Sequence, residues 1–256
     1  FGYRAAFVLT AVLLAVAGVL VSTLVRESFV PQPRTERSML GGMGAAFAHV
    51  LRAPGVGVVF VVRFSAWMGR TMIVPFLPLF VTGLMAGAAT SGIVTGMAIG
   101  AASAAGTFTS IALGKLGDRI GHRPILIAGS FATAIVYVPI AFVDSAWQLV
   151  ALYALTGATI GGVLPAISAM LAQLTDRGEA GSVYGLDNAI VATARAVSPV
   201  VGGALVAAVV VGRQPVGADY AVVFLAAAAL FAITGLLAAW RIPRRPPTTA
   251  SGSEAG

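Results

Sequence analysis

The sequence predicts an all-α integral membrane protein, and three observations lead to this class. Of the 256 residues, 58% are hydrophobic and only 10% are charged, and the mean hydropathy is +0.95. A soluble domain of this size needs a more polar surface than this composition allows. The apolar residues also fall into runs of about 20, the length that a bilayer-spanning helix needs. The charged residues, finally, gather in the short segments between these runs.

The runs predict one transmembrane helix, a polar linker and then a bundle of six further helices. The first span covers Ala5 to Val25, and the others cover 56–82, 91–113, 124–143, 147–174, 182–212 and 220–240. The domain organisation follows as a first span (1–26), a linker (27–55), a six-helix bundle (56–240) and a disordered tail (241–256). Within the linker, Met39, Met43 and Phe47 recur at helical spacing, which favours either a short amphipathic helix on the membrane surface or a weakly ordered connection.

The distribution of basic residues predicts how the chain crosses the membrane. Eleven of the sixteen Lys and Arg residues lie in four segments, 26–55, 114–123, 175–181 and 241–256. When these segments are placed together on one side, the other side holds only Arg4 and Arg213. Basic residues in short loops mark the cytoplasmic side. We therefore expect a multi-pass protein of the cell membrane, with these four segments cytoplasmic and anionic lipid headgroups as partners. The net charge of +7 then needs no nucleic acid to explain it.

Several kinds of chemistry are not indicated by the sequence. There is no cysteine, so disulfides and cysteine metal sites are excluded. His49 and His122 are too far apart in the sequence to suggest a metal site. No zinc-protease, phosphate-binding or serine-nucleophile motif occurs. We expect no metal, no cofactor and no enzymatic activity.

The most informative segment is the charged stretch between the runs 91–113 and 124–143. Its glycines allow a tight bend, and Pro124 suits the first turn of the following helix. Asp118 is an acid among cations, and near helix ends it can accept backbone N–H bonds. We predict a tight inter-helix turn over 114–123, built around Gly114, Leu116, Asp118, Arg119, Gly121 and Arg123.

This stretch, G-x-L-x-D-R-x-G-x-R, resembles the signature loop of the major facilitator superfamily of transporters. That family has the loop after its second helix and often a weaker copy after its eighth. His122 stands where the family usually has Arg or Lys. One helix, a linker and six tightly connected helices resemble helices six to twelve of a twelve-helix transporter, which implies that the first five helices are missing. The alternative is an ordinary positively charged loop that contains an aspartate.

Four charged residues lie inside predicted spans, where charges are costly and usually mark a pathway or a pair. Arg63 and Asp187 are expected at similar depth, and an ion pair between them would keep the carboxylate ionised. A purely structural pair and a role in transport are both open. Asn188 adjoins this acid. No further acid remains within the spans to pair with Arg70 and Arg195. This favours positions in which their side chains face a cavity.

The span 56–82 contains Pro75 and Pro78, which should kink or loosen its outer end. Its Pro-x-x-Pro pattern resembles helix seven of drug-efflux facilitators. In that family helices seven and ten line the central cavity, so Trp67 and Met72 are candidate substrate contacts. Packed or lipid-facing side chains are the alternative. The span 147–174 has a hinge-like Pro165 and fits helix ten.

Small residues in the span 182–212 resemble the antiporter motif G-x8-G-x3-G-P-x2-G-G. They are Gly185, Ser198, Pro199, Gly202 and Gly203. Ala194 and Ser198 replace two of the glycines of the motif. Family members have the motif on helix five, whereas this copy would lie on helix eleven, its symmetry mate. Generic packing of small residues is the alternative.

Together these resemblances imply a proton-coupled exporter of drugs or small metabolites that works by alternating access. Asp118, Arg119 and Arg123 would then act as a latch against the missing N-terminal half. The expected partners are a small-molecule substrate, protons, lipids and that half. Alternatives are a facilitator or symporter for a sugar or an organic anion, which free arginines would favour, and a truncated piece that is inactive alone.

Overall fold

The computed structural model describes residues 3–24, 55–85, 88–174 and 180–242. The expected amphipathic helix of the linker and the tail beyond residue 242 lie outside these ranges. All regular elements within them are helices. The chain divides into two compact units, Phe1–Gly41 and Gly42–Gly256, which are described separately.

The first unit contains the helix α1, Tyr3–Leu24. At about 1.5 Å per residue, its 22 residues are long enough to cross the hydrocarbon core of a bilayer, which is about 30 Å thick. The span expected from Ala5 to Val25 is therefore present, with ends that differ by one or two residues.

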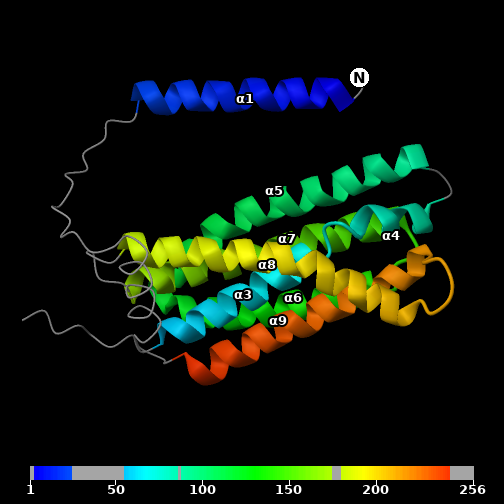
Figure 1. The fold of residues 1–256 in the computed structure, drawn as a ribbon. Helices are drawn as coiled ribbons and strands as arrows, with labels where there is room; N and C mark the ends of the chain where they lie inside the picture. The colour runs from blue at the N-terminus through cyan, green and yellow to red at the C-terminus, as the bar shows by residue number, and fades with distance from the viewer. Residues whose placement is uncertain (1–2, 25–54, 86–87, 175–179, 243–256) are drawn as a thin grey trace, which may run out of the picture. The chain divides into compact units, whose positions relative to one another are not determined.

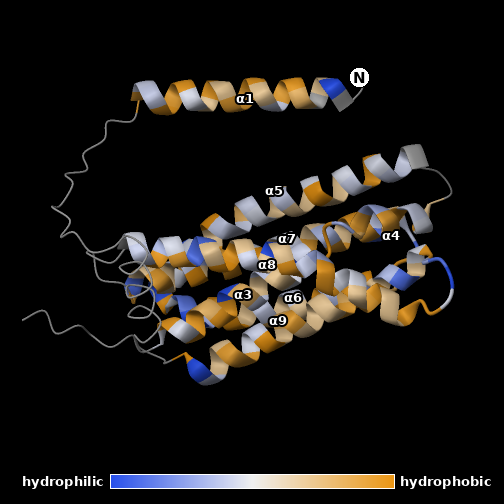
Figure 2. Cartoon of the chain, viewed as in Figure 1, coloured by the Kyte–Doolittle hydropathy of each residue, from blue (hydrophilic) through white to orange (hydrophobic). Residues whose placement is uncertain are grey.

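The second unit is a bundle of helices that lie side by side (Figure 1). Its elements are α3 (Val56–Met72), α4 (Leu77–Leu84), α5 (Ala88–Ile120), α6 (His122–Ile140), α7 (Ala146–Gln173), α8 (Ala180–Val209), the 3-10 helix η1 (Gly217–Tyr220) and α9 (Ala221–Arg241). Hydrophobic residues cover most of their length (Figure 2). In the two units together, seven segments of the described chain are long and apolar enough to cross a membrane.

The bundle is held together by apolar packing between helices that are distant in the sequence. Helix α5 packs mainly against α7, α6 lies against α7 and α9, and α3 lies against α8 and α9. The largest fully buried side chains include Phe224 and Phe231 of α9. Helices α5 and α7 approach each other closely at Gly157, where a Cβ atom would overlap the backbone of Ala102. A glycine is therefore required for the two helices to approach this closely.

The span 56–82 is interrupted at its outer end. Helix α3 ends at Met72, and α4 begins at Leu77 with Pro78 in its first turn. Proline has no N–H and its ring clashes with a carbonyl of the preceding turn. Around Pro75 the Val74 amide accordingly bonds to the Thr71 carbonyl in a tighter i→i+3 turn, at 3.3 Å. In contrast, α7 runs through Pro165 as one helix.

The extent predicted for the tight turn at 114–123 is wrong. Helix α5 continues to Ile120, and Gly121 with φ +93° is the single residue between α5 and α6. The 33 residues of α5 extend about 50 Å, which exceeds a hydrocarbon core of about 30 Å. The charged residues therefore lie on a helical extension beyond the apolar run. Gly121 ends this helix because glycine adopts positive φ without strain.

Candidate functional site

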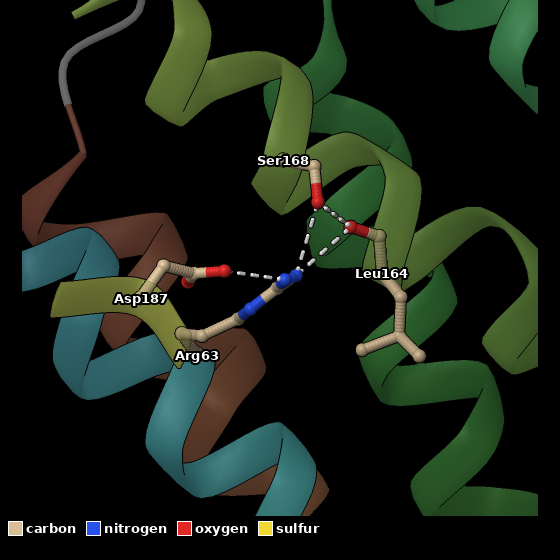
Figure 3. A network of polar contacts seen from close by, with 4 residues as sticks. All are labelled: Arg63, Leu164, Ser168 and Asp187. Atoms are coloured by element: carbon tan, nitrogen blue, oxygen red, sulfur yellow. Dashed lines mark hydrogen bonds and ion pairs between the residues drawn. The ribbon is translucent and has the colours of Figure 1, made fainter. Parts of the chain in front are cut away.

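A buried ion pair joins three helices of the bundle (Figure 3). The Arg63 Nη2 atom on α3 is 2.8 Å from Asp187 Oδ2 on α8. The Arg63 Nη1 atom donates to Ser168 Oγ at 3.1 Å and to the Leu164 carbonyl at 3.4 Å, both on α7. The side chains of the pair are only 11% and 9% exposed. The pair expected from the sequence is present.

This network neutralises two of the four charges that lie inside the spans. Its hydrogen bonding is incomplete, because Arg63 Nε and Asp187 Oδ1 are buried without a partner in the part of the chain that the structure describes. Desolvation offsets much of the attraction in such a pair, but removal of one partner would leave a buried charge. Asn188, which directly follows Asp187 in the sequence, is exposed and takes no part in the network.

The other two charges converge on one indole ring. The Cζ atom of Arg195 on α8 is 4.4 Å from the ring centroid of Trp67, and that of Arg70 is 5.6 Å away. Both distances are within the range of cation–π attraction. Both arginines are exposed. Among the described residues, the ion pairs within 4.0 Å include neither guanidinium.

A cavity of about 470 Å³ opens in the same bundle. Arg70 lines it and is the only charged residue among the described residues of its wall. The other polar side chains of its wall are the phenols and hydroxyls of Ser103, Thr107, Ser110, Tyr137, Tyr153 and Thr156. Apolar residues such as Val74, Leu77 and Ile160 complete the wall. The surface therefore combines apolar area with hydroxyl groups and one cation.

The sequence analysis missed the α5 side of this cavity. Ser103, Thr107 and Ser110 recur at spacings of four and three residues in the middle of α5. Such a polar stripe on one helix face was the available signal. Tyr137 and Tyr153 gave no comparable pattern, because only the packing of α6 and α7 brings them together at the cavity.

One candidate substrate contact is packed in the core, which was the alternative that the sequence left open. Met72 is fully buried in the core, where it lies against the position of Gly202 on α8. The last turn of α3 faces α8 at this level, so the thioether fills space between helices and does not line the cavity. Trp67 is half-buried, and the guanidinium groups of both arginines lie against its ring.

The residues of the antiporter-like motif form part of the contact between α8 and α3. The Ser198 side chain is fully buried, and its Oγ atom is 2.7 Å from Thr71 Oγ1. Gly202 admits Phe76 and Met72, since a Cβ atom would lie 2.6 Å from the Phe76 ring. Gly203 has looser surroundings, Pro199 is exposed, and at Gly185 a Cβ atom would meet nothing within 4 Å.

The signature stretch has one residue that is engaged within the bundle. The Arg123 guanidinium donates to the carbonyls of Ala239 and Ile242, at 2.6 and 2.8 Å, where α9 ends. A cation is favourable there because it meets unpaired carbonyls and the negative end of the helix dipole. The resemblance implied that Arg123 contacts a second half, but its guanidinium binds α9.

Several other signature residues lie at the surface of this unit, whereas the His122 side chain is only 9% exposed. Asp118 has a 74% exposed side chain, with its Oδ1 atom 3.4 Å from His122 Nε2. Leu116 and Arg119 are also exposed, and Gly114 has open space beside it.

Comparison with known proteins identifies the family. The family model for the Major Facilitator Superfamily matches residues 59–256. The chain belongs to this superfamily. It is also 28% identical over 206 residues to proteins named "Multidrug resistance protein MdtG" from Salmonella typhi, Salmonella newport (strain SL254) and Salmonella agona (strain SL483). Each match covers 80% of this chain and 50% of the relative.

The chain thus spans about half the length of the curated relatives that it matches. Its membrane-length helices and its family make it a multi-pass membrane protein of a transporter superfamily, and not an enzyme. The half-bundle expected from the sequence, with one preceding helix, is confirmed.

Proposed function

We propose that this chain is part of a secondary transporter that exports drugs or small metabolites across the cell membrane. The observation that supports this most directly is the family match together with the similarity to proteins named for multidrug resistance. The cavity of about 470 Å³ agrees with the proposal, because small-molecule sites commonly measure about 300–1,000 Å³. Its mixture of apolar and hydroxyl surface suits small organic molecules.

Alternating access is the mechanism that we propose, with the bundle moving largely as one body against a second half. The contacts of Arg63 with α7 and α8 support rigid movement, because they tie three helices together near one end of the bundle. We place the α5–α6 connection in the cytoplasm, as the basic residues favour. The exposed Asp118 and Arg119 are then available as a latch against the other half.

Proton coupling is proposed from the resemblance to drug:proton antiporters. Asp187 is one candidate for the coupling acid, and an acid in the other half of the transporter is the second. Asp187 already pairs with Arg63 at 2.8 Å, which favours the second candidate, because loss of the carboxylate charge would leave the guanidinium buried without a counter-charge.

To test this proposal, the complete reading frame is expressed in cells that lack their own efflux pumps. The accumulation of a panel of fluorescent drugs in these cells is then measured. We expect low accumulation that a protonophore raises, and a weaker effect with Asp118→Asn. Asp144→Asn is the matched control, since it removes another exposed aspartate, at the opposite end of the bundle. Unchanged accumulation across the panel, with the transporter present in the membrane, would contradict export.

A further inference from the structure

We propose that the guanidinium groups of Arg70 and Arg195, both held on Trp67, form a subsite for an acidic group of the transported molecule. A carboxylate, phosphate or sulfonate would have the required chemistry. The inference rests on the proposed transport function and names the substrate class of the cavity that Arg70 lines: an apolar or aromatic body with an oxyanion.

The first argument concerns charge balance. Asp187 already neutralises Arg63, so Arg70 and Arg195 are the cations that remain inside the spans of the described chain. The Cζ atoms lie 5.6 Å and 4.4 Å from the centroid of the same ring, so both positive charges are held at one indole. Two cations within a membrane-spanning bundle are costly unless an anion approaches them. Within the described part of the chain, no carboxylate lies within 4.0 Å of either guanidinium.

The second argument concerns how the two arginines are positioned. Thr71 follows Arg70 directly, and its hydroxyl is 2.7 Å from that of Ser198, one helical turn beyond Arg195. This contact fixes α3 against α8 beside the two arginines. The indole of Trp67 holds both guanidinium groups by cation–π attraction. Pre-positioned guanidinium groups lose less conformational entropy when they bind an oxyanion, so they bind it more tightly.

The third argument concerns the cavity itself. Arg70 lines it, together with hydroxyl groups that include those of Tyr137, Tyr153 and Thr156. Guanidinium and hydroxyl groups donate hydrogen bonds to an oxyanion, and the bonds from the guanidinium are charge-assisted. None of the lining residues in the described part of the chain is an acid. A cationic molecule would therefore meet no counter-charge on this wall, whereas an anionic one would.

The test measures binding of three related dyes to the complete transporter purified in detergent. Dansylglycine has a carboxylate, dansylamide is neutral and dansylcadaverine has an ammonium group. Dye fluorescence is titrated with wild-type protein and with Arg70→Gln, Arg195→Gln and Arg241→Gln. The last variant is the matched control, because Arg241 is exposed at the end of α9, away from the cavity.

We expect wild-type protein to bind dansylglycine at least about tenfold more tightly than dansylamide, which corresponds to one charge-assisted hydrogen bond. Arg70→Gln and Arg195→Gln should each remove most of this preference and leave dansylamide binding unchanged. Arg241→Gln should change neither. If a glutamine variant fails to fold, the lysine variant at the same position (Arg70→Lys or Arg195→Lys) is measured in its place. It should keep a reduced preference for dansylglycine, because lysine retains the charge without the planar fork.

Equal binding of dansylglycine and dansylamide, or a preference that survives both glutamine variants, would overturn the subsite. This result is expected if a carboxylate elsewhere in the transporter already neutralises the two arginines. Uptake of the dyes into proteoliposomes, driven by a proton gradient, tests the proposed function separately. Arginine-dependent binding without gradient-driven movement would support the subsite and contradict transport. Gradient-driven movement of dansylcadaverine, together with no preference for dansylglycine in binding, would support transport and contradict the subsite.

Discussion

At the scale of single residues, the main electrostatic feature is the contact between Arg63 and Asp187. The two side chains are almost fully enclosed by α3, α7 and α8, and each leaves one buried polar atom without a partner in the described structure. The attraction between two such charges is offset by the loss of their hydration. The net stabilisation by the intact pair is therefore smaller than the destabilisation expected when one partner alone is removed.

Arg63→Met should destabilise the bundle by about 3 kcal/mol or more, because Asp187 would remain buried without a counter-charge. The double variant Arg63→Met with Asp187→Leu should recover most of this loss. The measurement is the unfolding midpoint of the purified transporter in detergent, followed by tryptophan fluorescence. A double variant as unstable as the single one would show that hydrogen bonds to α7, and not charge balance, dominate at this site.

Ser198→Ala tests the other polar contact between α3 and α8. Loss of the Ser198–Thr71 hydrogen bond, 2.7 Å long and buried, should lower the free energy of unfolding by about 1 kcal/mol. Thr193→Ala is a suitable control, since that hydroxyl is exposed and bonds only within its own helix. The same unfolding assay applies, and equal effects of the two substitutions would contradict a structural role for the contact.

At the scale of helices, the structure depends on two places where one element closely adjusts to another. One is the end of α9, which Arg123 binds through two carbonyls. The other is the crossing of α5 and α7 at Gly157, where the backbones meet. In both places a residue of one helix determines how the neighbouring helix ends or packs.

Arg123→Ala should fray the last turn of α9. The carbonyls of Ala239 and Ile242 would lose their charged donor, which costs about 1 kcal/mol at such a partly exposed site. Hydrogen exchange read by mass spectrometry should show faster exchange in peptides that cover the end of α9. Arg119→Ala removes an exposed neighbouring cation and should leave these peptides unchanged. If both variants accelerate exchange equally, a general effect of removing positive charge, and not the Arg123 contact, explains the result.

Gly157→Val should push α5 away from α7, because its side chain would overlap the Ala102 backbone. Overpacking of this kind usually costs about 1–3 kcal/mol, and a backbone that cannot yield makes it larger. We expect less folded transporter, measured as the monodisperse fraction in size-exclusion chromatography. Ala104→Val, on the exposed side of α5, is the control. A normal profile for Gly157→Val would mean that the helices separate without loss of the fold.

At the scale of the whole molecule, the arrangement of basic residues leads to a prediction about orientation. The chain contains no cysteine, so single cysteines report topology once any others in the complete reading frame are removed. Lys115→Cys should react with a membrane-impermeant maleimide only after the cells are permeabilised, and Gln214→Cys should react in intact cells. The opposite pattern would reverse the proposed orientation.

Much of this architecture follows from the sequence, because membrane-spanning helices can be recognised from their apolar composition. A run of about 20 apolar residues has few alternatives to a spanning helix. The spans therefore agree with the helices to within a few residues at most ends, apart from the far end of α5. The same principle indicated the Arg63–Asp187 pair, because a charge inside a membrane must find a partner.

What the sequence left open was decided by how the helices rotate and approach one another. A helix that is apolar on all sides gives no signal about which face meets its neighbours. For this reason only the tertiary structure placed Met72 in the core, Arg123 on the end of α9, and Arg70 at a cavity with Tyr137. The sequence by itself determined the class, the spans and the charges that required partners. Tertiary packing determined which charges stay unpaired within the described helices, because pairing depends on distances of a few ångströms between helices that local patterns do not specify.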